Sequence, residues 1–83
     1  MKEPTTSQSK PISYNRYKCR CNIYKYRRAK RMTQDKLAHL VGVRRETICR
    51  IENDKFVPSL ELAIALSDAL EESVNALFTL SIK

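Results

Sequence analysis

The sequence predicts a mainly α fold of five short helices with two short flanking β-strands, at about 16–21 and 78–82. Two observations support it. Between residues 22 and 77 apolar residues recur at helical spacing, and residues that favour helix starts precede most of these segments. On either side of this stretch, apolar and polar residues alternate with the period of a strand. The 83 residues are enough for one small domain.

The N-terminal region differs in composition from the rest of the chain. Residues 1–11 are rich in Pro, Ser, Thr and Lys without periodicity, which is typical of a mobile tail. From residue 16 to 21, basic residues alternate with Tyr and Cys, which predicts a strand. We therefore divide the chain into a basic N-terminal arm at 1–21, a helical domain at 22–78 and a C-terminal strand at 79–83.

Five helices are expected between the strands, at 23 to about 30, 34–41, 44–53, 60–70 and 74–77. Their expected capping residues are Asn22, Thr33, Ser59 and Ser73. Gly42 ends the second helix, because glycine adopts a positive φ without strain. Apolar residues lie nearly all round the segment 60–70, which predicts a central buried helix.

The net charge of +7 is unevenly distributed. Residues 1–32 contain ten basic residues and one acidic residue, whereas residues 33–83 are slightly acidic. A basic region of this size predicts a polyanionic partner, either nucleic acid or an anionic membrane surface. No apolar stretch approaches the roughly 18–20 residues of a membrane span, and the polar N-terminus does not predict a secretory signal. We therefore expect a cytoplasmic protein.

The polar residues do not indicate an enzyme or a metal site. The chain has one His and no paired catalytic motif. Its three cysteines, Cys19, Cys21 and Cys49, are expected to be free thiols in a reducing compartment. They could join His39 as zinc ligands only by long-range convergence, and a Cys-x-Cys spacing is unusual for zinc. We expect no metal and no cofactor.

Six short motifs in register mark the middle of the chain. They are TQ at 33–34, LA at 37–38, Gly42, TI at 47–48, IEN at 51–53 and PS at 58–59. This combination resembles the phage-repressor and Cro-type helix-turn-helix proteins, the Xre family, over about residues 22–78. The resemblance implies a five-helix repressor-like DNA-binding bundle, in which two helices joined at Gly42 form the helix-turn-helix.

The resemblance also implies a function. We expect a sequence-specific double-stranded DNA-binding transcriptional regulator, a repressor, which inserts helix 44–53 into the major groove as a homodimer. The alternative is an antitoxin-like module, or another one, that binds a protein partner through the same fold. Membrane binding through the basic arm ranks last, because the arm lacks a large apolar face.

Helix 44–53 carries the candidate base contacts. Its apolar residues Ile48 and Ile51 face inward, so the opposite side faces solvent, where Arg can donate two hydrogen bonds to guanine. Glu46 either accepts from cytosine N4 or orients Arg45 and Arg50, and its i, i+4 spacing to Arg50 favours the second role. The expected base-contacting residues are Arg44, Arg45, Glu46 and Arg50.

The resemblance implies a second set of residues that contact the phosphate backbone and set register rather than sequence preference. They are Gln34, Thr47, Asn53 and Lys55. Gln34 begins the second helix, where free N–H groups favour anions. Thr47 has an equally plausible role as a residue that packs against that helix. Cys49 is expected to be a small filler rather than a redox sensor.

The family resemblance further implies an internal ion pair between Arg27 and Glu52. It also exposes departures from the family pattern. Glycine is usual in the family at the positions of Arg31, Asp54 and Glu71, so a positive φ is expected at each. Arg44 replaces the family's capping serine, which removes a cap worth about 0.5–2 kcal/mol and adds a cation at the DNA surface.

The two predicted strands lie outside the family pattern. We expect them to pair, to bury their apolar faces on the bundle away from helix 44–53, and to close a dimer across a two-fold axis. The expected exposed face carries Arg16, Lys18 and Arg20. The alternative is that residues 1–21 form a loose arm that orders only on DNA.

Overall fold

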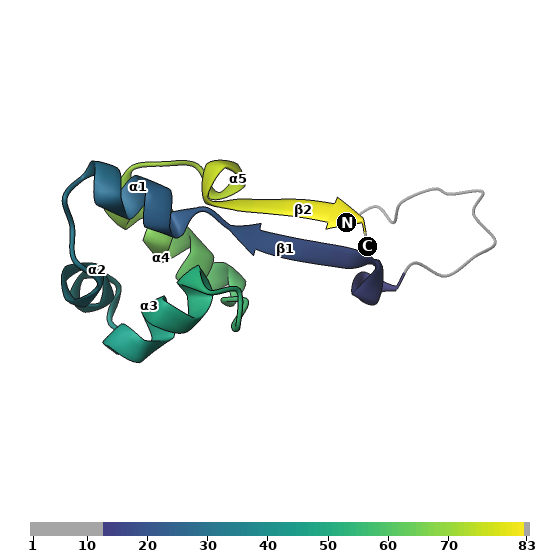
Figure 1. Cartoon of the computed structure of the whole chain (residues 1–83), viewed down its shortest axis with the longest axis horizontal. Helices are drawn as coiled ribbons and strands as arrows, with labels where there is room; N and C mark the ends of the chain where they lie inside the picture. Colours follow the sequence, from purple (N-terminus) through teal and green to yellow (C-terminus); the bar gives the residue numbers. More distant parts are fainter. Residues whose placement is uncertain (1–12, 83) are drawn as a thin grey trace, which may run out of the picture.

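The structure, a computed structural model, describes residues 13–82 and confirms the mainly α prediction. The helices form a bundle at one end of the molecule, and the two strands form a ribbon that extends from it (Figure 1). The elements are a 3-10 turn at Tyr14–Arg16, β1 at Tyr17–Cys21, α1 at Ile23–Ala29, α2 at Gln34–Val41, α3 at Arg45–Glu52, α4 at Leu60–Leu70, α5 at Val74–Leu77 and β2 at Phe78–Ile82. The tail predicted for residues 1–11 lies outside the described residues.

Every helix contributes to one hydrophobic core. The fully buried large side chains are Ile23, Leu37, Ile48, Ile51, Leu66, Leu70 and Leu77. α2 packs closely against both α3 and α4, so α3 is held in place by apolar burial on its inner side. Within the described part of the chain, no helix has the length and apolar composition to cross a membrane.

Three of the four predicted capping side chains are confirmed. The hydroxyl groups of Thr33, Ser59 and Ser73 each accept a hydrogen bond from a backbone N–H in the first turn of the following helix. Asn22 occupies the predicted position before α1, but its side chain does not cap the helix. Its side-chain amide donates instead to the Ala76 carbonyl at 3.0 Å, and its backbone N–H donates to Leu77 O at 2.7 Å. Asn22 therefore ties the start of α1 to α5.

Helix ends in this fold use left-handed backbone, as expected from the departures from the family pattern. Gly42, Arg31, Asp54 and Glu71 have φ values of 78°, 55°, 58° and 57°. The residue after each donates its N–H to a carbonyl five positions earlier, which closes the last turn of the helix. At Arg31 and Glu71, a side chain occupies a conformation that favours glycine.

Replacing Arg31 by glycine should therefore stabilise the protein. The side chain of Arg31 makes no hydrogen bond or ion pair within residues 13–82, so its loss removes only backbone strain. We expect Arg31→Gly to raise the free energy of unfolding by up to about 1 kcal/mol, measured by urea denaturation. Arg28→Gly, inside α1, is the control and should lower it by about 1 kcal/mol. A less stable Arg31→Gly protein would contradict the strain argument.

The prediction that α4 is a central buried helix is wrong. Its buried residues, Ala63, Leu66 and Leu70, lie on one side, whereas Leu60 is 70% exposed and Ile64 is also exposed. α4 packs mainly against α2 and α5, and the side that carries Leu60 and Ile64 is exposed. The prediction failed because the apolar composition of residues 60–70 does not show which side chains pack in the core and which remain on the surface.

β1 and β2 pair as an antiparallel ribbon, which confirms the expected pairing. The register places Tyr17 opposite Ile82, Lys18 opposite Ser81 and Arg20 opposite Thr79. The strand starts at Tyr17 rather than Arg16, because Ser13 caps a 3-10 turn that includes Arg16.

The expected position of the ribbon needs two corrections. Its apolar face is not buried on the bundle, because Leu80 and Ile82 are 69% and 68% exposed. Nor does the ribbon lie away from α3, because Cys21 N–H donates to Asp54 Oδ1 at 3.0 Å. Asp54 immediately follows the cap of α3. Only the end of the ribbon near Phe78 packs on the core, since the strands extend beyond the helices.

Candidate nucleic-acid interface

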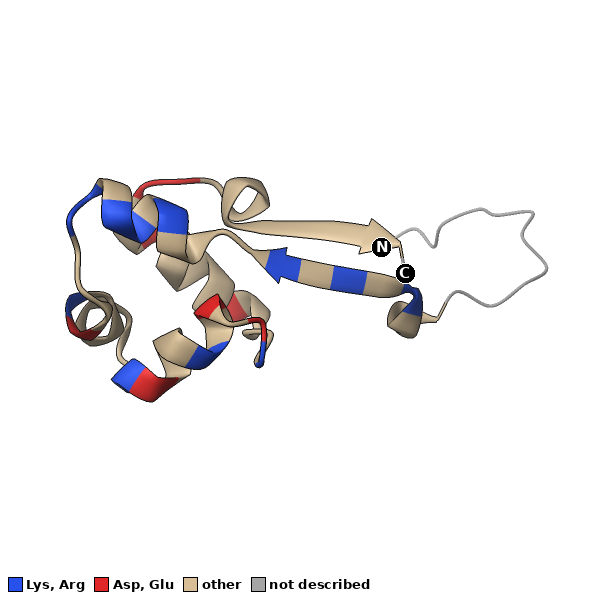
Figure 2. Cartoon of the chain, viewed as in Figure 1, with Lys and Arg blue, Asp and Glu red and all other residues tan. Residues whose placement is uncertain are grey.

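The outer side of α3 presents charged residues on a helix that is anchored by its inner side. Ile48 and Ile51 are fully buried. Four predicted base-contacting residues are exposed: Arg44, Arg45, Glu46 and Arg50. Arg44 occupies the capping position without a side-chain cap, as the sequence predicts. α3 lies at the edge of the bundle, and its ribbon carries both basic and acidic residues (Figure 2).

A buried ion pair joins α1 to the C-terminal end of α3. Arg27 Nε and Glu52 Oε2 lie 2.6 Å apart, and the two side chains are 7% and 5% exposed. A second bond connects Arg27 Nη2 to Glu52 Oε1 at 3.1 Å, and Arg27 Nη1 donates to Met32 O at 2.8 Å. The ion pair implied by the family resemblance is therefore present, and the arginine reaches a carboxylate with two donors.

Gln34 links this buried pair to the surface of α3. Its Nε2 donates to Glu52 Oε1 at 2.9 Å, and its Oε1 accepts from Arg45 Nη1 at 3.4 Å. The side-chain amide thus connects the exposed Arg45 to the protein interior. The sequence indicates nothing of this role, because Gln34 and its partners lie on different helices. The N-terminal N–H groups of α2 still form the anion-favouring end at which Gln34 sits.

The predicted orientation of Arg50 by Glu46 is wrong in this structure. No ion pair joins them among the described residues; instead, Asp35 Oδ1 of α2 lies 3.8 Å from Arg45 Nε. An exposed i, i+4 pair gains only about 0.2–0.5 kcal/mol, so solvated side chains compete well with it. Asp35, in the first turn of α2, is thus a residue near the interface that sequence reasoning missed.

The remaining candidate phosphate contacts lie along α3 and the loop after it. Thr47 is half-buried, which fits packing against α2 as well as a contact. Asn53 is exposed, and its amide donates to Cys49 O at 2.9 Å, which closes the end of α3. Lys55 is exposed on the following loop. The candidates thus come from the start of α2, from α3 itself and from the segment that follows α3.

The three free cysteines are half-buried and do not form a reactive centre. Burial raises the pKa of the Cys21 thiol to about 11. Burial and the negative charge of Asp54 also raise the pKa of Cys19. Thiols with raised pKa values are poor nucleophiles at neutral pH. Within residues 13–82, no group of three or more His, Cys, Asp or Glu side chains could hold a metal ion, and His39 is exposed on α2.

Comparisons with known proteins match the helical part of this chain. Residues 23–77, which span α1 to α5, match a family described as helix-turn-helix. An uncharacterized HTH-type transcriptional regulator of Archaeoglobus fulgidus is 41% identical over 59 residues, which are 71% of this chain and 83% of that protein. A similarly named regulator of Methanothermobacter thermautotrophicus is 39% identical over 59 residues, 70% of this chain and 86% of that one.

A solved structure is also similar. It is the restriction-modification controller protein C.AhdI from Aeromonas hydrophila, with a TM-score of 0.61 and 28% sequence identity. The similarity covers 64% of this chain and 80% of that one. The shared part is thus the size of the helical bundle, and the family match leaves both strands of the ribbon outside.

Proposed function

Because this chain belongs to the helix-turn-helix family of DNA-binding transcriptional regulators, we propose that it is a sequence-specific repressor, which binds a double-stranded operator as a homodimer. The observation that supports this most is the outer face of α3. Three arginines are exposed there, on a helix whose inner side is held by buried apolar residues and by the Arg27–Glu52 pair. A rigid helix with exposed donors suits the major groove.

In this proposal, the exposed residues divide into two roles. Arg44, Arg45 and Arg50 donate to bases, and Glu46 accepts from cytosine N4. The start of α2 at Gln34 and the residues Thr47, Asn53 and Lys55 contact phosphates on either side of α3 and set its register. Gln34 helps to orient Arg45 for contact with a base, because Arg45 donates a hydrogen bond to Gln34 in the absence of DNA.

In this proposal, the protein represses transcription by occupying its operator. A dimer on an operator that overlaps a promoter excludes RNA polymerase, and this action requires no contact between the protein and the polymerase. In this proposal, the protein is located in the cytoplasm together with the DNA that it binds. A reporter gene placed behind the bound site distinguishes the two directions of control: a repressor lowers its expression, and an activator raises it.

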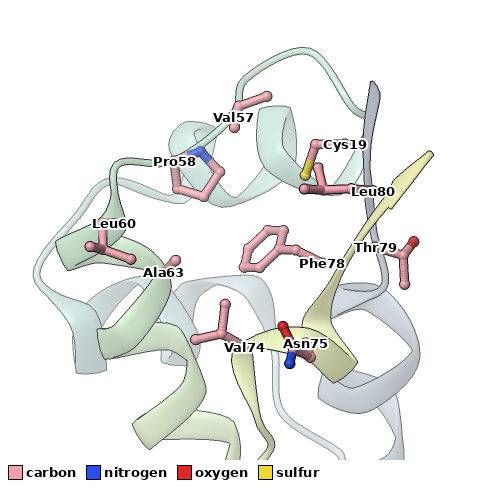
Figure 3. Close-up of a pocket in the computed structure, with 10 residues that line it drawn as sticks. All are labelled: Cys19, Val57, Pro58, Leu60, Ala63, Val74, Asn75, Phe78, Thr79 and Leu80. Carbon is pink, nitrogen blue, oxygen red and sulfur yellow. The ribbon is translucent and has the colours of Figure 1, made fainter. Parts of the chain in front are cut away.

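The homodimer is supported by an exposed apolar surface that includes part of the ribbon. We define this surface by Val57, Leu60, Leu80 and Ile82, all of which are large and exposed. Three of these residues, Val57, Leu60 and Leu80, line a hollow into which Cys19 and Phe78 also point (Figure 3). A second copy of the chain would cover the surface symmetrically, and paired half-sites about one DNA turn apart require such a dimer.

Selection of bound sequences from random double-stranded DNA tests the function directly. We expect enrichment of one motif with two inverted half-sites, whose centres lie about 10 base pairs or a multiple apart. Recovery of unrelated sequences would contradict sequence-specific binding. A single half-site would retain the DNA-binding function and contradict the homodimer.

Variants of the ribbon test the dimer. Leu80→Thr with Ile82→Thr removes exposed apolar side chains and keeps residues that favour strands. We expect a monomer in analytical ultracentrifugation, with weaker binding to the two-half-site operator. The matched control is Thr79→Ala with Ser81→Ala, on the opposite face of β2, which should remain a dimer. If the Leu80 and Ile82 variant also remains a dimer, the surface does not hold the two copies together.

A further inference from the structure

The two faces of the ribbon differ in chemistry. The face that borders the hollow carries Cys19, Phe78 and Leu80, whereas Thr79 points away from it (Figure 3). Residues opposite each other in the register share a face, so Arg20 lies on the side of Thr79 and Lys18 on the side of Ser81. The second face is thus basic and polar, and all its charge comes from β1 (Figure 2).

Within residues 13–82, neither cation of this face takes part in an ion pair. Lys18 and Arg20 are both exposed. The ion pairs within residues 13–82 join Arg27 to Glu52, Lys30 to Glu71 and Arg45 to Asp35, and none involves the ribbon. Two cations that are fixed on a strand without an acidic partner form a site for a polyanion.

The position of β1 relates this face to the proposed operator. The Cys21 N–H bond to Asp54 Oδ1 fastens the end of β1 to the loop after α3. Farther along the strand, Tyr17, Lys18 and Cys19 line one hollow together with Asp54 and Val57 of that loop. Lys55, a proposed phosphate contact, lies between these two loop residues. β1 is therefore the strand of the ribbon that borders the DNA-facing loop.

We propose that Lys18 and Arg20 contact the phosphate backbone of the same duplex, beyond the Lys55 end of α3. This inference rests on the proposed function. The contacts add affinity without sequence preference, because phosphates are the same at every base pair. They extend the protein's footprint past the half-site that α3 occupies, through an element that lies outside the family match.

The test measures the salt dependence of DNA binding for the full chain. Lys18→Gln with Arg20→Gln removes the two ribbon cations. Its matched control, Lys25→Gln with Arg28→Gln, removes one Lys and one Arg from exposed positions of α1. Both variants have the same net charge, so any difference between them reports the position of the charge. Affinity is measured from low to moderate salt on the selected operator and on an unrelated duplex of equal length.

We expect the slope of log affinity against log salt to fall in magnitude by about 1.8 for the ribbon variant, since each phosphate contact contributes about 0.9. The affinity loss should be equal on the two duplexes, and the hydroxyl-radical footprint should shorten at one edge of each half-site. The α1 control should keep the wild-type slope and footprint.

Equal slopes for the two variants would overturn the ribbon contact and leave the proposed function intact. A ribbon variant that loses affinity for the operator only would also overturn it, since backbone contacts cannot discriminate. Failure of the proposed function is a different result: the wild type would show no preference for any sequence. Even then, the slopes on the unrelated duplex would decide whether the ribbon contacts phosphates.

Discussion

Glu52→Ala is expected to lower the free energy of unfolding by about 3–5 kcal/mol, because it leaves the buried Arg27 guanidinium without its carboxylate. The loss also frees the amide of Gln34, which donates to the same carboxylate. Thermal unfolding followed by circular dichroism measures the effect. For a domain of this size, each kcal/mol lowers Tm by roughly 4–8 °C, so the shift should exceed about 10 °C.

Two further variants separate this explanation from a general effect of removing a glutamate. Glu52→Ala with Arg27→Met removes both charges and should recover part of the lost stability. Glu61→Ala removes an exposed glutamate from the first turn of α4 and should change the free energy of unfolding by less than about 1 kcal/mol. If Glu52→Ala melts like the wild type, the pair contributes nothing to folding.

The second large effect concerns DNA binding. Arg45→Ala and Arg50→Ala should each weaken binding to the selected operator by about 1–3 kcal/mol and relax the preference at one base pair. The reason is that each removes a bidentate donor from the exposed face of α3. Titration against the operator and against a set of single-base variants measures both quantities.

Lys55→Ala is the informative comparison for these arginines. As a phosphate contact, Lys55 should affect all sequences equally and contribute about one unit to the salt slope. Arg45→Ala and Arg50→Ala should therefore alter the order of preferred sequences, whereas Lys55→Ala should not. If both arginine variants bind the operator with wild-type affinity, the proposed orientation of α3 on DNA is wrong.

Helix ends in this protein are predictable from the sequence because the interactions that form them are local. Thr33, Ser59 and Ser73 cap helices through residues three positions later, so the sequence alone contains both partners. Gly42 ends α2 through its own backbone. The side chain of Asn22 could also cap a helix, but its amide donates to a carbonyl of α5 instead. No local sequence pattern indicates this contact, because the two residues are far apart in the sequence.

The site is predictable in its residue types but not in its connections. The exposed arginines of α3 follow from helical periodicity, and the Arg27–Glu52 pair follows from the family resemblance. The link from Glu52 through Gln34 to Arg45 depends on how α2 and α3 pack, so side-chain spacing within one helix cannot reveal it. The exposure of Leu60 and Leu80 could not be predicted for a related reason. An apolar side chain can pack in the core or form a surface that another molecule covers, and its hydrophobicity is the same in both cases.

The pairing of β1 with β2 has a consequence for the order of folding. The two strands come from opposite ends of the described chain, whereas α2 with α3 and α4 with α5 are neighbours in sequence. Contacts between sequence neighbours form with a small loss of chain entropy, and distant contacts form more slowly. The ribbon therefore forms after the helices have packed and have brought its strands together. During synthesis, β1 is made before β2, which is the last element described. β1 therefore has no strand to pair with until β2 has been synthesised.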